Sequence, residues 1–131
     1  MKPNNKKLLR RLTGVLAAAG ILVAIFLWFG RPMLVDTSVN GAYTVELLAL
    51  DSPDWPFGSQ DGRLVLKKAG WTVCEQDFEL RNDGKGMDRS NWSVAWDDEK
   101  AAVTISGEEQ PDALYHLYFT GAAVRVKTGK D

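Results

Sequence analysis

Apolar and polar residues alternate in short segments along the last two thirds of the chain. In the segment 42–50, alternate positions from Tyr43 to Ala49 are apolar, which is typical of a half-buried strand. The same alternation recurs in the segments 63–68, 71–76, 77–80, 92–97, 102–106, 113–119 and 122–127. Turn-forming residues separate these segments. The pattern therefore predicts an all-β domain of six or seven antiparallel strands, arranged as a small sandwich, a barrel or a curled sheet.

A continuous apolar run precedes this domain. Residues 12–30 carry no charged side chain, and as a helix they would reach ~28 Å, close to the ~30 Å hydrocarbon core of a bilayer. The alternative is a cleavable signal peptide, whose apolar stretch is normally ~7 to 15 residues long and ends in small residues. Here the end of the run, 25–29, is bulky. The run predicts one retained transmembrane anchor, followed by a short stalk at 31–40 and an extracytoplasmic domain at 41–131.

Charge is distributed unevenly along the chain. Residues 1–11 contain five basic residues and no acid, whereas the rest of the chain contains eleven basic and seventeen acidic residues. Basic residues beside a span stay in the cytoplasm, so we expect 1–11 to be a cytoplasmic tail and the β domain to lie outside the cell membrane. An acidic domain also lacks the positive surface that nucleic-acid binding requires.

The anchor contains small residues at a spacing that permits helix pairing. Gly14 with Ala18, and Gly20 with Ala24, are each one helical turn apart. Pairs of this kind allow helices to approach closely in a bilayer. Self-association of the chain is therefore possible, in addition to contact of residues 12–30 with the lipid bilayer.

Few residues offer catalytic or metal-binding chemistry. Cys74 is the only cysteine and His116 the only histidine, so neither an intramolecular disulfide nor an ordinary zinc site can form. A Cys74–His116 nucleophile pair is formally possible, but no orienting motif surrounds either residue. We expect Cys74 to be a small buried residue, His116 to face outward, and the protein to be non-enzymatic, with no cofactor and no metal.

The segment 51–62, DSPDWPFGSQDG, is the most distinctive loop. Its two prolines stiffen the chain, and Gly58 and Gly62 let it turn. Its aromatic rings can fold back over the end of the sheet as a lid, or face outward to anchor a partner. The candidate ligand-binding or partner-binding residues, most of them in this loop, are Trp55, Phe57, Trp71, Asp51, Asp54 and Asp61. Residues 82–88 form a second loop rich in side-chain oxygens.

The loop segment belongs to a pattern that resembles a group of known proteins. Residues 40–121 include Gly-x-Tyr-x-Val at 41–45, Trp-Pro-Phe-Gly at 55–58 and Gly-Glu-Glu-Gln at 107–110. The pattern resembles uncharacterised small membrane-anchored proteins of low-GC Gram-positive bacteria. The resemblance implies a bacterial single-pass protein with an extracytoplasmic β domain, and it implies no activity and no functional residues.

Anchor and domain together predict a membrane-tethered, non-enzymatic interaction or accessory module at the outer face of the membrane. Its partner would be a membrane or secreted protein, because tethering raises the local concentration of a binding domain. The alternative is a module that binds cell-wall glycan or calcium through the loop 51–62, since aromatic rings can stack on sugars and carboxylates suit a hard cation.

Overall fold

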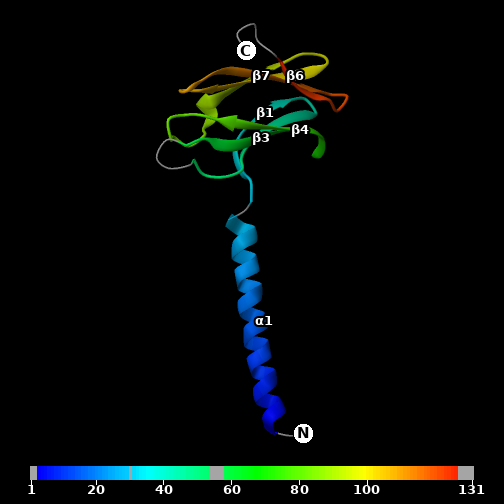
Figure 1. Cartoon of the computed structure of the whole chain (residues 1–131). Coiled ribbons are helices and arrows are strands. Elements are labelled where there is room, and N and C mark those ends of the chain that lie inside the picture. The colour runs from blue at the N-terminus through cyan, green and yellow to red at the C-terminus, as the bar shows by residue number, and fades with distance from the viewer. Residues whose placement is uncertain (1–2, 30, 54–57, 127–131) are drawn as a thin grey trace. The chain divides into compact units, whose positions relative to one another are not determined.

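The computed structural model describes residues 3–29, 31–53 and 58–126. It divides the chain into two compact units, Met1–Arg31 and Pro32–Asp131. The first unit consists of helix α1, Pro3–Phe29, and the second is a β domain (Figure 1).

Helix α1 is longer than the apolar run predicted from the sequence. It begins at Pro3 rather than at residue 12, so Lys6, Lys7, Arg10 and Arg11 of the tail are helical. Proline is favoured in the first helical turn, and lysine and arginine are good helix formers, which explains the early start. The segment Asn5–Leu27 is long and apolar enough to cross a membrane, and none of it is buried within the protein.

The β domain contains two four-stranded antiparallel sheets, which we call sheet A and sheet B. In both sheets, the spatial order of the strands follows their order in the chain. Sheet A consists of β1 (Met33–Asn40), β2 (Tyr43–Ala49), β3 (Gln60–Lys68) and β4 (Trp71–Leu80). Sheet B consists of β5 (Trp92–Trp96), β6 (Lys100–Gly107), β7 (Gln110–Tyr118) and β8 (Ala123–Val126). A short 3-10 helix, Arg89–Asn91, precedes β5.

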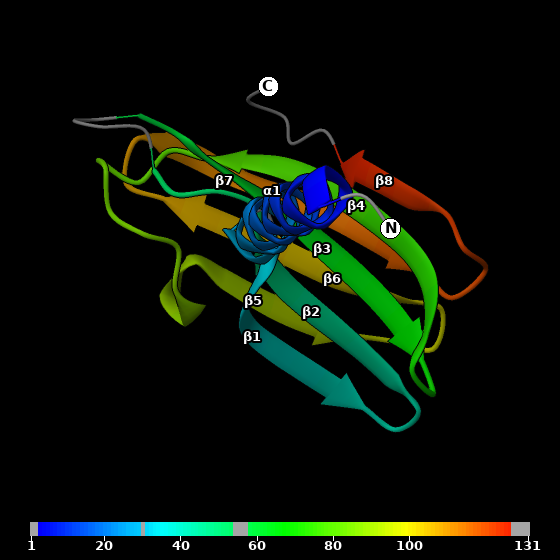
Figure 2. The ribbon, with the colours of Figure 1, turned by 90° about the horizontal axis from the view of Figure 1, so that it is seen from below.

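The two sheets lie one behind the other, with their strands running in similar directions (Figure 2). A single apolar core fills the space between them, because alternate residues of each strand point inward. The core residues are Val45, Leu47, Leu64, Leu66, Cys74, Phe78, Leu80, Ala101, Val103, Ile105, Ala113, Tyr115 and Leu117. The predicted all-β domain is therefore confirmed, and it is a sandwich rather than a closed barrel.

Two details of the strand assignment from sequence are wrong. The predicted stalk at 31–40 contains β1, and the segments 71–76 and 77–80 form one strand, β4. The described residues thus contain eight strands, where six or seven were expected. Strand β1 lacks an apolar alternation because two of its residues are polar partners of sheet B. Trp92 Nε1 donates to Asp36 Oδ2 at 2.9 Å, and Trp96 Nε1 donates to Ser38 Oγ at 3.0 Å.

Candidate functional site

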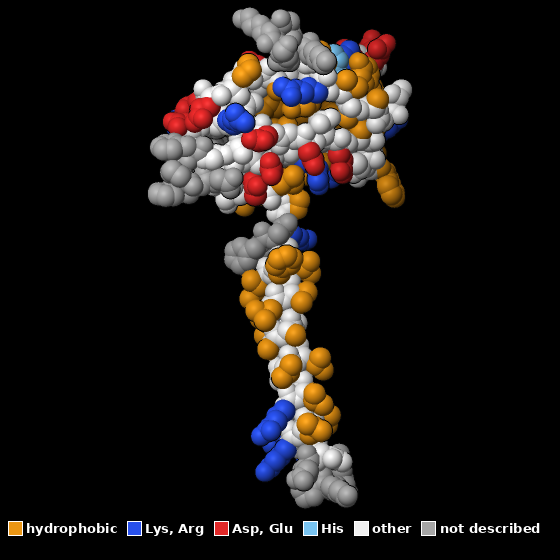
Figure 3. Space-filling view, in the orientation of Figure 1, with side chains coloured by type: hydrophobic (Ala, Val, Ile, Leu, Met, Phe, Trp, Pro, Cys, Tyr) orange, Lys and Arg blue, Asp and Glu red, His pale blue; other side chains and the backbone are white. Residues whose placement is uncertain are grey.

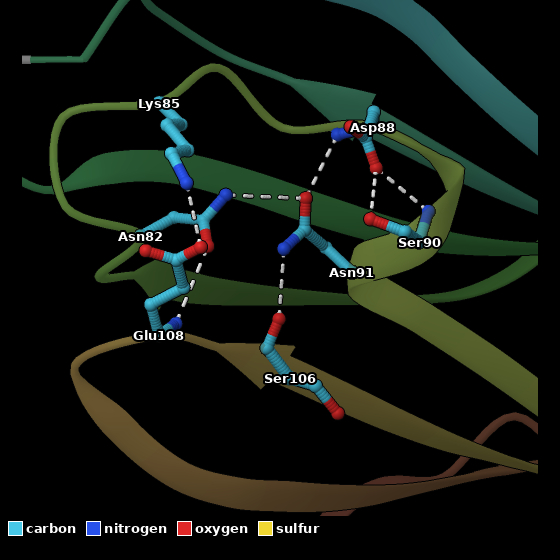
Figure 4. Close-up of polar contacts among 7 residues, drawn as sticks. All are labelled: Asn82, Lys85, Asp88, Ser90, Asn91, Ser106 and Glu108. Atoms are coloured by element: carbon cyan, nitrogen blue, oxygen red, sulfur yellow. Dashed lines mark hydrogen bonds and ion pairs between the residues drawn. The ribbon is translucent and has the colours of Figure 1, made fainter.

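A polar cluster lies where the chain crosses from sheet A to sheet B (Figure 4). Asn82 and Asn91 are both buried, and Asn82 Nδ2 donates to Asn91 Oδ1 at 3.5 Å. Asn91 Nδ2 also donates to the carbonyl oxygen of Ser106 at 2.9 Å, and Asn82 Oδ1 accepts from the Glu108 amide at 3.3 Å. The two asparagines therefore join the crossover segment to the turn that leads from β6 to β7.

Around these asparagines, the remaining side chains of the cluster also have internal partners. The Ser90 hydroxyl and the Ser90 amide both donate to Asp88 Oδ1, the amide at 2.7 Å, and they lower the pKa of Asp88. Lys85 Nζ lies 2.7 Å from Glu108 Oε1. An open cavity of about 390 Å³ lies beside the cluster. No buried side-chain polar atom in the described residues lacks a hydrogen-bond partner. The cluster is thus satisfied internally, as expected of a structural joint.

The described ends of the loop 51–62 are held together by hydrogen bonds. Asp51 Oδ1 accepts from the Asp61 amide at 2.9 Å, and the Leu50 amide donates to the Asp61 carbonyl oxygen at 2.9 Å. Gln60 is buried, and its Nε2 donates to the Asp51 carbonyl oxygen at 2.8 Å. The Asp51 side chain therefore closes the base of the loop.

Of the remaining candidate residues, the structure describes Trp71. Trp55, Phe57 and Asp54 lie outside the described residues, so neither the lid nor the outward arrangement is tested. Trp71 follows the tight turn between β3 and β4, and it is 82 % exposed. Within the described part of the chain, no three histidine, cysteine, aspartate or glutamate side chains form a group that could hold a metal ion.

Cys74 and His116 lie on opposite sides of sheet B. Cys74 comes from β4 of sheet A and lies on the inner side of sheet B, whereas His116 lies on its outer side. Cys74 belongs to the core between the sheets, and burial raises the pKa of its thiol. In β7, Tyr115 and Leu117 point into that core, so His116 between them faces outward, and its Nδ1 lies 3.4 Å from the Tyr118 hydroxyl. Both positions agree with the sequence analysis. Strand β7 thus separates the two groups, and they cannot act as a nucleophile and its base.

The outer surface of sheet B is nearly free of charge. Cross-strand pairing places its outward residues in two rows, each running across all four strands. One row contains Ala95, Ala102, His116 and Val124, and the other contains Ser93, Thr104, Leu114 and Val126. We call these eight residues the uncharged face. Charged residues occur at its two ends, where Lys100 precedes one row and Asp112 follows the other.

The outer surface of sheet A is the opposite in character. Its outward positions on β2, β3 and β4 carry five acidic residues, Glu46, Asp61, Glu75, Asp77 and Glu79, and two basic residues, Arg63 and Lys67. Figure 3 shows acidic side chains gathered over this layer of the domain.

Ion pairs engage both basic residues of this surface. Arg63 Nε donates to Asp77 Oδ1 at 2.6 Å, which lowers the pKa of Asp77, and Lys67 Nζ lies 2.6 Å from Glu46 Oε1. Strands β2 to β4 of sheet A therefore present water with the charged surface expected of a solvated sheet, and the uncharged face of sheet B does not.

Comparison with known proteins finds no match for the chain. No family model, no curated protein and no solved structure matches it. The resemblance to small membrane-anchored bacterial proteins therefore stays a prediction. The uncharged face is the feature that sequence reasoning missed. The sequence carries part of this signal, because no carboxylate or ammonium occurs at the outward positions of the three segments, which are 93, 95, 102, 104, 114 and 116.

Proposed function

We propose that the protein is a membrane-tethered, non-enzymatic interaction module, and that its β domain binds protein through the uncharged face. The helix α1 anchors the chain in a cell membrane, with the N-terminus in the cytoplasm and the domain outside. The orientation is supported by the five basic residues in 1–11. The partner surface that contacts this face is itself uncharged, because a charged group would lose its hydration there without gaining an ion-pair partner.

The uncharged face is the single observation that carries this proposal. Seven of its eight residues carry no ionisable group, and the remaining one is a histidine. Val124 in one row is 48 % exposed, and Leu114, His116 and Val126 are partly exposed. A sheet surface in contact with water normally carries charged and polar side chains, as sheet A does. Depletion of charge on one surface of a small domain is typical of the centre of a protein–protein interface.

Chemistry elsewhere in the described residues favours binding over catalysis. The thiol of Cys74 is buried, the imidazole of His116 faces away from it, and the carboxylates of sheet A are engaged in ion pairs or exposed to water. In the part of the chain that the structure describes, no set of groups converges on a cleft in the way that general acid–base or nucleophilic catalysis requires. A tether suits a binding domain, because it raises the local concentration of that domain at the membrane surface.

Site-specific photo-crosslinking of the full-length protein in membranes tests this proposal. A photoreactive amino acid replaces Ala95 on the uncharged face, and the same amino acid replaces Thr37 on β1 as the matched control. We expect a discrete protein adduct from position 95 and none from position 37. The adduct should disappear when Thr104→Glu places a charge on the face. Adducts from position 37 alone, or an adduct at 95 that is insensitive to Thr104→Glu, would overturn the proposed binding surface.

A labelling experiment tests the proposed orientation separately. Glu109→Cys adds an exposed thiol at the turn between β6 and β7, and Asn5→Cys adds one near the start of α1. A membrane-impermeant maleimide applied to intact cells should label the Glu109→Cys chain and leave the Asn5→Cys chain unlabelled until the cells are opened. Labelling in the reverse order would place the domain in the cytoplasm.

A further inference from the structure

The uncharged face is divided into a low half and a raised half. Strands β5 and β6 contribute the small side chains Ser93, Ala95, Ala102 and Thr104, whereas β7 and β8 contribute the larger Leu114, His116, Val124 and Val126. Each row therefore rises from small residues on one side to large residues on the other. The boundary between the halves runs along the strands, between β6 and β7.

We propose that the partner of the uncharged face is the same face of a second copy of this chain. This inference rests on the proposed function and names its partner. A twofold axis parallel to the strands, between β6 and β7, places β7 of the second copy over β6 of the first, and β8 over β5. The raised half of each copy then lies over the low half of the other, and the contact is made twice, as an isologous interface requires.

The twofold axis specifies which residues meet. It places each row of one copy opposite the corresponding row of the other copy. Ala102 therefore faces His116 of the second copy, and Thr104 faces Leu114 of the second copy. The side chains of two packed sheets share a gap of ~10 Å, so a small residue opposite a large one fills it better than two large residues. The alternative axis, across the strands, would place β7 over β7 and set large residues against each other.

Charge also favours pairing through sheet B. No ionised carboxylate or ammonium lies in the two rows, so two copies can meet there without burying an unpaired charge. At the end of the face, Lys100 keeps its ion pair with Asp97 at 2.8 Å and lies over the ring of Tyr118, 5.7 Å from its centre. The outer surface of sheet A carries five acids against two bases, and two such surfaces would repel each other.

The size of the face indicates a weak contact that the membrane strengthens. Four strands at ~4.8 Å spacing and two rows of residues give an area on the order of 300 Å² per copy, or about 600 Å² in total. Stable complexes of freely diffusing proteins usually bury more than ~1,200 Å². Two copies confined to one bilayer have a much higher effective concentration, so a contact of this size is sufficient to pair them there.

Photo-crosslinking between two differently tagged full-length copies in one membrane tests this inference. The photoreactive amino acid at position 95 of one copy should attach to β8 of the other, near Val124, and mass spectrometry locates the attachment. Thr104→Glu in both copies, or Leu114→Lys in both copies, should reduce the yield of the adduct by at least roughly tenfold, because each buries two unpaired charges. The mixed pair, with Thr104→Glu in one copy and Leu114→Lys in the other, should recover the yield.

The outcomes separate this inference from the proposed function. An adduct from position 95 to a different protein would leave the proposed function standing and overturn the pairing of two copies. A further outcome is that adducts between two copies form with the same yield in both charge variants and disappear with Gly14→Leu in α1. That result would place the association in the membrane helix, and it would also overturn the pairing through the uncharged face. Failure of the mixed pair to recover would contradict the twofold axis. Tryptophan near-UV circular dichroism of each variant confirms that its fold is intact.

Discussion

The indole nitrogen of Trp92 donates a hydrogen bond of 2.9 Å to the carboxylate of Asp36, across the gap between the two sheets. The residues are 56 positions apart in the chain, and they belong to the strands β5 and β1 that form one edge of each sheet. Trp96 repeats the arrangement with the hydroxyl of Ser38. Two side-chain hydrogen bonds thus hold one edge of the sandwich closed, where the apolar core ends.

The two tryptophans should contribute unequally to stability. Trp92→Phe removes the donor to a charged acceptor, so we expect the free energy of unfolding to fall by about 2 to 3 kcal/mol. Trp96→Phe removes the donor to a neutral hydroxyl, and about 1 kcal/mol should be lost. Both changes delete the same atoms, so each variant is the control for the other. Urea denaturation of the full-length protein in detergent measures the two losses, and equal losses would contradict the role given to the Asp36 carboxylate.

Gly107 should be intolerant of any side chain. A Cβ atom built there would lie 2.3 Å from the carbonyl oxygen of Arg81 and 3.1 Å from a methyl group of Leu80. The carbonyl belongs to the backbone and cannot rotate away, so Gly107→Ala should lower the free energy of unfolding by about 1 to 3 kcal/mol. Gly86→Ala is the control, because a Cβ atom there meets nothing within 4 Å. If the two variants have the same melting temperature in thermal unfolding, the close approach of the Arg81 carbonyl oxygen to Gly107 is absent in solution.

Acid should destabilise the domain in a specific pH window. Lys100 and the amides of Glu99 and Lys100 donate hydrogen bonds to Asp97, and they lower its pKa from 3.8 to about 2. A carboxylate whose pKa is lower in the folded state contributes stability that is complete above its unfolded pKa and is lost as pH falls toward its folded pKa. The melting temperature should therefore be level near neutral pH and fall between pH 3.8 and about 2.

The variant Asp97→Asn identifies the source of that acid transition. It keeps the acceptor oxygen of the turn but loses the charge, so its melting temperature should be lower at pH 7 and fall less between pH 4 and pH 2. The measurement belongs at low salt, because salt screens exposed charges. A variant with the same acid transition as the unchanged protein would assign the loss to other carboxylates, such as Asp77, whose pKa Arg63 lowers.

Cys74 should react slowly with thiol reagents while the protein is folded. Its side chain is buried with the residue 8 % exposed, and burial raises the pKa of the thiol, so little of the reactive thiolate is present. We expect labelling to be roughly 100-fold slower than in denaturant, because the reagent must wait for local opening. The Glu109→Cys chain supplies an exposed thiol for comparison. Equal rates at the two positions would show that Cys74 is reachable and would reopen a chemical role for it.

The sequence predicts the all-β domain well because most strands alternate in the ordinary way. Val45 and Leu47 in β2, and Tyr115 and Leu117 in β7, are apolar and buried, so their periodicity is visible without a structure. Strand β1 is hidden because Asp36 and Ser38 are polar partners of tryptophans in a strand more than fifty residues later. No local pattern contains that information, because it depends on how the sheets dock.

Prediction of the candidate site from the sequence is limited in the same way, because it also depends on how distant residues are placed. The aromatic and acidic loop residues that the sequence suggests include Asp51, whose side chain closes the base of its own loop, and Trp71, which is exposed at a turn. The uncharged face is made of ordinary residues such as Ala102 and Leu114, and each is unremarkable by itself. The sequence shows that their positions are uncharged, but only the register of the four strands shows that they lie side by side on one surface.

The order of the strands has a consequence for how the domain folds. Within each sheet, every strand after the first pairs with the strand that precedes it in the chain, and the first four strands complete one sheet before the fifth begins. Closing such neighbouring hairpins costs little loop entropy, because few residues separate the partners. Only the docking of one sheet on the other requires contacts between distant residues. The domain should therefore fold quickly for an all-β protein, with two separate hairpin arrays forming early and their union as the slow step.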